Sequence, residues 1–187
     1  MLMEKWDLFD EKRNPLFCIH NKGEKLSLGT YHIVVGVWVL NSQGELLITL
    51  RSNHKEKYPG LWENTYGSLF AGENSKSGAV RELYEETGIH ISEDELIYCC
   101  TTKGKTSFVD MYMLHHDTPI RKLKMQKGET VAAKWVTLDE FEKMFSLNLV
   151  SPLAIERYYL VKDILLNHKN YLDNFIGQKT CLRVATR

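Results

Sequence analysis

The sequence predicts an α/β or α+β fold in which β-strands surround one helix rich in carboxylates. Runs of β-branched and aromatic residues, separated by turn sequences, predict the strands. Apolar residues at helical spacing predict helices at residues 75–87 and from residue 151 onward. The chain has 187 residues, which is enough to bury the core of one domain of ordinary size.

The first third of the chain predicts strands joined by turns. Residues 4–28 alternate short apolar runs with turn sequences, which is typical of a β-hairpin placed before the main domain. Residues 31–40 and 45–50 predict an antiparallel pair, buried on both faces because neither segment alternates cleanly. A short strand at residues 62–66 should lead into the first helix.

The helix at residues 75–87 has recognisable ends. Asn74 or Ser75 can cap its start, and Gly88 is placed to take the left-handed conformation that ends it. One broad apolar face should pack against a sheet and consists of Ala79, Val80, Leu83, Tyr84 and Thr87. Three acidic residues should project together on the other side, namely Glu82, Glu85 and Glu86.

The remainder of the chain continues the same mixture of elements. Further strands are expected at residues 96–103, 106–116 and 131–137, and a short helix at residues 139–145. A longer helix should occupy residues 151–168. The tail, residues 170–187, mixes apolar and basic residues without clear periodicity, so the sequence predicts no structure for it.

Composition restricts the functional class. The formal net charge is zero, with 24 basic and 24 acidic residues, so the sequence predicts no basic surface for nucleic acid. The four cysteines have neither metal-type spacing nor the density of a secreted disulfide scaffold, and we expect free thiols in a reducing cytoplasm. The start lacks the apolar core of a signal peptide, and the longest apolar run, residues 33–40, is too short to cross a membrane.

Three carboxylates on one helix face repel each other unless a positive charge neutralises them. Hard divalent cations such as Mg²⁺ or Mn²⁺ take oxygen ligands and would do so. The alternative is that a glutamate-rich face is ordinary solvated surface. The wider pattern decides between the two interpretations.

Nine positions between Gly67 and Ile89 follow one fixed pattern. Gly67 and Glu73 are separated by five residues, and seven more residues lead to the run Arg81-Glu82-Leu83-x-Glu85-Glu86-x-Gly88-Ile89. Chance would produce such a match in this chain more rarely than about once in a million. The pattern resembles the Nudix hydrolase signature, G-x5-E-x7-R-E-U-x-E-E-x-G-U with U aliphatic, at every position.

The resemblance implies a Nudix α/β/α sandwich with a mixed sheet. Periodicity alone predicts the hairpin at 4–28 and the C-terminal helix 151–168, and from the chain length we expect these flanks, the tail and the core to form a single domain over residues 1–187. The resemblance itself covers the core at about residues 27–148. It also implies a hydrolase that uses Mg²⁺, or Mn²⁺, to cleave a diphosphate linkage. The metal ligands would be Glu82, Glu85 and Glu86, with Glu73 assisting from the loop.

Arg81 is a structural partner in the resembled family. Its spacing from Glu85 allows an ion pair one helical turn apart, which would orient that carboxylate. The general base is open, because family members take it from the motif helix or from a later loop. The candidates here are Glu82 and Glu129, and the alternative for Glu129 is a solvated loop acid.

Arg51 and Lys55 are the expected substrate-binding cations, since they follow a core strand and precede the motif. Together with Tyr31-His32 and Pro59-Gly60, they resemble the Nudix subgroup that includes isopentenyl-diphosphate isomerase. That likeness raises isomerisation as an alternative. Residues 62–73 contain neither the cysteine nor the histidine of the isomerase, and the motif helix is complete, so hydrolysis is favoured.

A further alternative is a non-catalytic Nudix module that senses a nucleotide. Such modules often lack motif glutamates, and none is missing here. Tyr58 and Phe70 are the aromatic residues most suited to contact a substrate, because they lie on loops near the motif. The sequence is compatible with a homodimer through the N-terminal hairpin or the C-terminal helix, but carries no direct signal for it.

Overall fold

The computed structural model describes the backbone of residues 4–184 and the side chains of residues 4–168. The chain divides into two compact units. The first contains the described parts of residues 1–38, 65–113 and 124–126, and the second those of residues 39–64, 114–123 and 127–187. The carboxylate-rich helix and the predicted hairpin both belong to the first unit.

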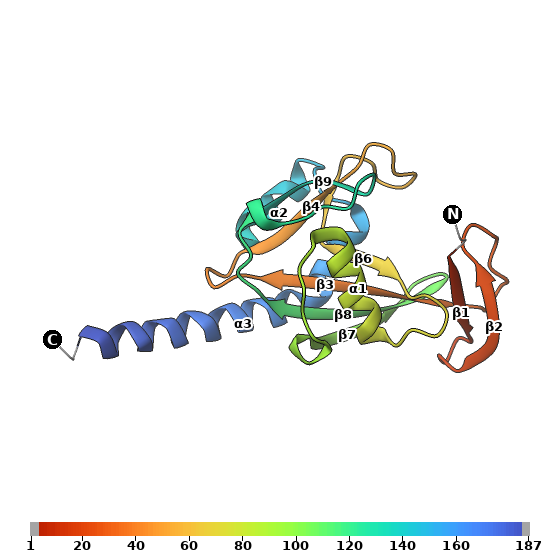
Figure 1. The fold of residues 1–187 in the computed structure, drawn as a ribbon, viewed down its shortest axis with the longest axis horizontal. Helices are drawn as coiled ribbons and strands as arrows, with labels where there is room; N and C mark the ends of the chain where they lie inside the picture. Colours follow the sequence, from red (N-terminus) through yellow and green to blue (C-terminus); the bar gives the residue numbers. More distant parts are fainter. Residues whose placement is uncertain (1–3, 185–187) are drawn as a thin grey trace. The chain divides into compact units, whose positions relative to one another are not determined.

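The N-terminal hairpin is present as expected (Figure 1). Strands β1 (Lys5–Phe9) and β2 (Pro15–Asn21) pair antiparallel and form a two-stranded sheet. The Asp10 carboxylate closes their connection by accepting hydrogen bonds from the backbone N–H groups of Lys12 and Asn14, both at 2.8 Å. Aspartate favours such turns because its side chain can bond to nearby backbone amides.

The rest of the first unit combines strands with the motif helix. Strand β3 (His32–Leu40) pairs antiparallel with β6 (Thr65–Ser68), and β7 (Ile97–Lys103) pairs antiparallel with β8 (Ser107–His115). Helix α1 (Ser75–Thr87) packs against β6 (Figure 1). A short 3₁₀ helix, η1 (Glu93–Glu95), follows it. The loop between β6 and α1 carries Glu73.

The second unit is organised around one strand. Strand β4 (Leu46–Arg51) pairs antiparallel with β5 (Trp62–Glu63), with β9 (Thr130–Val136) and with the last residue of β3. Its helical elements are η2 (Ile120–Lys122), α2 (Leu138–Ser146) and α3 (Pro152–Val184). The predicted α+β class, with a multistranded sheet, an N-terminal hairpin and a C-terminal helix, is confirmed.

Helix α1 begins and ends where the sequence predicts. The Asn74 side chain accepts a hydrogen bond from the N–H of Ser77. Gly88 has a φ of 72°, in the left-handed region that favours glycine, and its N–H donates to the carbonyl of Tyr84 at 2.8 Å. Both caps satisfy backbone groups that an uncapped helix end would leave without partners.

Two residues of α1, Tyr84 and Glu86, lie on a different face from the one that the sequence predicts. Tyr84 was expected in the apolar face but is 45% exposed, whereas Glu86 was expected beside Glu82 and Glu85 but is only 8% exposed. Glu86 follows Ala79 by seven residues, so the two lie within about 20° of each other around the helix. Its direction is therefore that of the buried residues Ala79, Leu83 and Thr87.

Other differences concern element boundaries. The single strand expected at residues 62–66 is two strands, β5 and β6, which are interrupted at Asn64. The backbone of α3 continues beyond residue 168 to Val184, because no proline interrupts the helix after its first residue. The assignment of residues 1–187 to a single domain stays a prediction. Among the described residues, no helix is both long and apolar enough to cross a membrane.

Candidate active site

Glu82 occupies the space that Gly67 leaves open. A Cβ atom at Gly67 would lie 1.7 Å from Cδ of Glu82, so any other residue at position 67 would displace the carboxylate. Burial raises the pKa of Glu82 to about 7, although the neighbouring Arg81 guanidinium opposes that rise. The glycine of the motif thus explains how a glutamate side chain is seated against the β6 backbone.

Arg81 connects the carboxylates around it. Its Nε lies 2.7 Å from Oε1 of Glu73, and its Nη1 lies 2.8 Å from Oε1 of Glu82 and 3.3 Å from Oε2 of Glu85. Nη2 donates to the carbonyl of Ser68 at 3.0 Å. The ion pair between Arg81 and Glu85 that the helical spacing predicts is confirmed. One guanidinium therefore holds three motif carboxylates in a single cluster, which we call the motif cluster: Glu73, Arg81, Glu82 and Glu85.

Two further contacts fix the motif cluster. The Arg81 guanidinium lies over the Phe70 ring. Its Cζ is 3.7 Å from the ring centroid, a distance typical of a cation–π contact. Burial alone would raise the pKa of Glu73, but hydrogen bonds from Arg81 and from the Phe70 N–H lower it below its usual value. Phe70 was expected to face a substrate, and its observed partner is Arg81.

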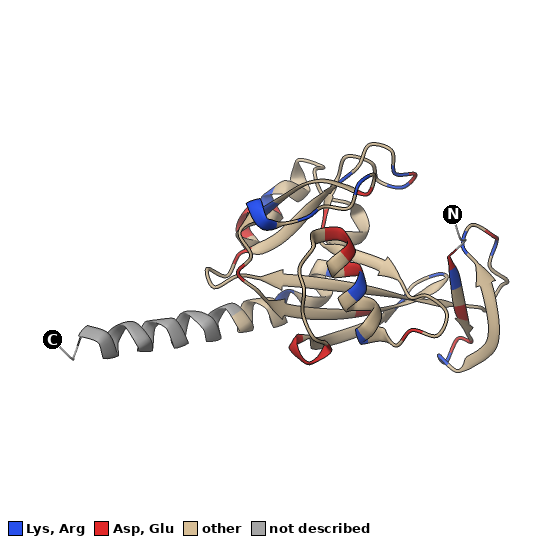
Figure 2. Ribbon diagram, in the orientation of Figure 1, with Lys and Arg blue, Asp and Glu red and all other residues tan. Residues whose placement is uncertain are grey.

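The carboxylate oxygens around Arg81 are the kind of ligand atom that a hard divalent cation prefers. Figure 2 shows the acidic segments gathered in the second half of α1. Among the side chains that the structure describes, no three histidine, cysteine, aspartate or glutamate residues are grouped closely enough to hold a metal ion. Arg81 forms ion pairs with Glu73, Glu82 and Glu85, and Glu86 is buried.

The predicted substrate-binding cations lie in the second unit, and each has a carboxylate partner. Arg51 forms an ion pair with Glu63, and its Nε donates to the carbonyl of Lys57 at 3.0 Å. Burial raises the pKa of Glu63, and Arg51 opposes that rise. Lys55 forms an ion pair with Glu129, the loop candidate for the general base. The sequence did not indicate Glu63, because its pairing with Arg51 depends on the register of β4 and β5.

His32 is one of the residues on which the likeness to the isomerase subgroup rests. Its side chain is buried, and the Trp6 ring of the hairpin stacks on it at a centroid distance of 4.0 Å and an interplanar angle of 11°. A histidine covered by a parallel indole has a packing role that accounts for its burial.

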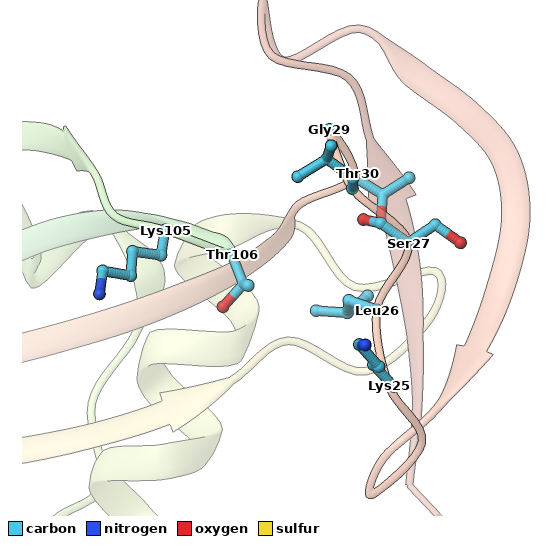
Figure 3. A pocket seen from close by; sticks show the side chains of 8 residues that line it. Lys25, Leu26, Ser27, Gly29, Thr30, Lys105 and Thr106 are labelled. Carbon is cyan, nitrogen blue, oxygen red and sulfur yellow. The ribbon is translucent and has the colours of Figure 1, made fainter.

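One pocket lies elsewhere in the first unit. It has a volume of about 540 Å³ and lies between residues 25–30 on one side and Lys105 and Thr106 on the other (Figure 3). None of its lining residues belongs to the motif or to the predicted substrate-binding set. The motif cluster, and not this pocket, is therefore the candidate active site.

Comparison with known proteins identifies the family. The model of the NUDIX domain matches residues 30–158. The Nudix hydrolase lmo0368 of Listeria monocytogenes is 34% identical over 169 residues, which is 90% of this chain and 96% of that protein. The crystal structure of DR0079 from Deinococcus radiodurans aligns with a TM-score of 0.67 and 21% identity, over 79% of this chain and 92% of that one.

Two further matches bear on the subgroup and on the fold. An isopentenyl-diphosphate Delta-isomerase of Citrobacter koseri is 32% identical over 92 residues, 49% of this chain and 51% of that enzyme. A bifunctional NMN adenylyltransferase/ADP ribose pyrophosphatase from Francisella tularensis, complexed with AMP and a Mn ion, aligns with a TM-score of 0.54 at 20% identity, over 74% of this chain and 42% of that one. The partial likeness to isopentenyl-diphosphate isomerase was expected from the sequence. The chain belongs to the Nudix family and is a hydrolase of the Nudix type.

Proposed function

We propose that the chain is a Mg²⁺-dependent hydrolase, also served by Mn²⁺, that cleaves the diphosphate linkage of a nucleoside-diphosphate-linked or related X-diphosphate substrate. The observation that carries the proposal is the motif cluster, in which one arginine organises three carboxylates beside a helix. The Francisella tularensis neighbour, complexed with AMP and a Mn ion, supports the choice of substrate class and of cation.

Glu82, Glu85 and Glu86 are the proposed metal ligands, and Glu73 assists them. A bound divalent cation would neutralise the diphosphate and lower the pKa of an attacking water. Arg81 orients Glu73, Glu82 and Glu85, so its proposed role is positioning. Because Gly67 leaves room for Glu82, the carboxylate can stay close to the backbone without strain.

The general base is proposed to be Glu82 or Glu129. Glu82 is buried, which favours a carboxylate that can accept a proton near neutral pH. Glu129 lies on a later loop, where it forms an ion pair with Lys55. The kcat of Glu129→Gln at saturating Mg²⁺ distinguishes them, because loss of the base lowers kcat by about 10²–10⁴-fold. An unchanged kcat in Glu129→Gln, with activity lost in Glu82→Gln, would exclude Glu129 as the base.

Arg51 and Lys55 are proposed to bind the diphosphate of the substrate. An arginine fork and a lysine ammonium both suit phosphate oxygens. Each cation has a carboxylate partner in the second unit, so binding of a diphosphate would exchange one anionic partner for another. Substrate binding should therefore loosen the pairs with Glu63 and Glu129.

The test is a substrate screen with Mg²⁺ and, in parallel, with EDTA. It uses nucleotide sugars, dinucleotide polyphosphates, nucleoside triphosphates, coenzyme A and isoprenoid diphosphates. We expect release of a phosphorylated product from at least one diphosphate, and loss of that release in EDTA. Conversion of isopentenyl diphosphate to its dimethylallyl isomer would establish the isomerase instead, and binding without any turnover would favour a sensing module.

We also propose a cytoplasmic location and a small-molecule partner, with no nucleic-acid or membrane partner. The cysteines with described side chains, Cys18, Cys99 and Cys100, are free thiols, which agrees with a reducing compartment. Cys181 lies outside the described side chains. A homodimer stays a prediction, and light scattering of the purified chain measures the oligomeric state directly.

A further inference from the structure

The N-terminal hairpin contacts the loop that carries Glu73. The carbonyl of Lys5 accepts a hydrogen bond from the N–H of Ala71 at 2.7 Å. Oδ2 of Asp7 accepts one from the N–H of Gly72, also at 2.7 Å. Gly72 has a φ of 86°, so this turn depends on glycine and its backbone N–H points toward the hairpin. Strand β1 thereby holds the two residues that immediately precede Glu73.

The hairpin turn makes a second contact, with Asp110 of β8, which in turn bonds to the start of α1. Arg13 donates from Nη1 to Oδ1 of Asp110 at 2.7 Å and from Nη2 to Oδ2 at 2.5 Å, which is a bidentate ion pair. Oδ2 of Asp110 also accepts from the hydroxyl of Ser75, the first residue of α1, at 2.5 Å. Asp110 therefore bonds at once to the hairpin and to the motif helix.

Asp110 is an unusual residue for its position. It is 2% exposed in a strand whose neighbours are apolar, and a buried carboxylate requires strong partners. Arg13, Ser75 and Thr101 supply them. Arg13 itself has a φ of 66°, a left-handed conformation that non-glycine residues rarely adopt.

We propose that the hairpin positions the motif loop, with Asp7 and Arg13 as positioning residues for the metal site. The hairpin bonds directly to Gly72 and reaches Ser75 through Asp110, so its contacts restrain the segment on both sides of Glu73. The hairpin precedes the matched NUDIX domain, which begins at residue 30. This inference rests on the proposed function, because it takes the motif carboxylates as the cation ligands.

The alternative is that the hairpin only packs against strand β3, where Trp6 stacks on His32, and does not position the motif loop. The two interpretations differ in what a single hydrogen bond does. If the hairpin only packs against β3, removing the Asp7 carboxylate leaves the motif loop unchanged. If it positions the loop, the same change loosens the backbone at Gly72 and weakens cation binding.

The experiment compares Asp7→Ala with Asp7→Asn, which keeps an oxygen acceptor, and with Glu24→Ala as the matched control. Glu24 is an exposed residue just beyond β2, and its bonds within the described part of the chain are to His20 and Asn21. The readouts are amide hydrogen exchange at Gly72 by NMR and the Mn²⁺ dissociation constant by electron paramagnetic resonance. We expect Asp7→Ala to lose protection at Gly72 and to weaken Mn²⁺ binding by about tenfold, the usual effect of removing an outer-shell partner.

Asp7→Asn should restore most of both values, and Glu24→Ala should match the wild type. Wild-type exchange and Mn²⁺ affinity in Asp7→Ala would overturn the proposal, and so would equal effects of Asp7→Ala and Glu24→Ala. Arg13→Lys, which keeps the charge but loses the bidentate geometry, should weaken Mn²⁺ binding in the same direction. Substrate turnover by the wild type tests the proposed function separately, because neither readout requires a substrate.

Discussion

The two units both contain clusters of acidic and basic side chains, but the clusters are built differently. In the first unit, one guanidinium serves Glu73, Glu82 and Glu85, all within a short stretch of sequence. In the second unit, Arg51 and Lys55 each have one carboxylate partner. A shared cation makes the three carboxylates depend on one residue, whereas Glu63 and Glu129 each bond to a different cation.

This difference predicts where single substitutions have large effects. Removing one member of the motif cluster alters the surroundings of all the others, so effects there should be large and non-additive. Removing one member of a separate, partly exposed pair should have a local and smaller effect. We therefore expect the largest loss of activity at Glu82 and the smallest loss of stability at Lys55.

Glu82→Gln should have the largest effect on activity. Its carboxylate is a proposed cation ligand and one candidate for the general base, so we expect kcat to fall by at least about 10²-fold. Initial rates at saturating Mg²⁺ measure the change. The matched control is Glu93→Gln, an exposed glutamate in η1, which should keep the wild-type rate. Wild-type kcat in Glu82→Gln would contradict the assignment of the site.

Arg81→Lys should follow, because a lysine ammonium cannot contact three carboxylates in the fork geometry of arginine. We expect kcat/KM to fall by about 10–100-fold, as for other partners that orient ligands. We also expect the free energy of unfolding to fall by about 1–3 kcal/mol, since charged hydrogen bonds are lost. Denaturant unfolding and steady-state kinetics measure both, with the exposed Arg121→Lys as control.

Asp110→Asn should change how stability depends on pH. Burial alone would raise the pKa of Asp110, but the hydrogen bonds from Arg13, Ser75 and Thr101 lower it below the ordinary value of 3.8. A lowered pKa in the folded state stabilises the fold above the ordinary pKa, and that stabilisation is lost as pH falls through the folded-state pKa.

The free energy of unfolding of Asp110→Asn should therefore lie below that of the wild type near neutral pH, and the gap should narrow below pH 3.8. Urea unfolding of both proteins over a pH series measures it. A gap that stays constant through the acid range would show that the charge of Asp110 does not stabilise the fold.

Lys55→Met should have the smallest effect on stability. The side chains of Lys55 and Glu129 are 28% and 40% exposed, so the loss of their pair should change the free energy of unfolding by about 0–1 kcal/mol. If Lys55 binds the diphosphate, KM should rise by about tenfold while kcat changes little. Lys57→Met, an exposed neighbour, is the control. An unchanged KM would remove Lys55 from the substrate site.

The difference between the motif cluster and the ion pairs of the second unit also explains which features the sequence could predict. The ends of α1, its capping residues and the pair between Arg81 and Glu85 follow from local spacing, and all are confirmed. The partners of Arg51 and Lys55 depend on strand register and on a loop far along the chain, so no local pattern indicates them. Glu86 shows the limit within the helix. It lies four residues after Glu82 and seven residues after the buried Ala79, so helical spacing alone is compatible with either face.

The hairpin illustrates the same limit. Its strands and turn were expected from composition, but its bonds to the Gly72 backbone and to Asp110 join residues far apart in sequence. One signal could have indicated Asp110, since it is the only charged residue between Phe108 and Leu114 in an otherwise apolar strand. A buried charge of that kind requires a partner, although the sequence does not say which one.

The most direct test of the difference between the two units is the Mn²⁺ dissociation constant, measured by electron paramagnetic resonance for the wild type, Glu82→Gln and Glu129→Gln. If the motif cluster provides the cation site, Glu82→Gln should weaken Mn²⁺ binding by at least about tenfold, and Glu129→Gln should leave it at the wild-type value. Wild-type affinity in Glu82→Gln, or a greater loss in Glu129→Gln, would contradict the assignment of the metal site to the first unit.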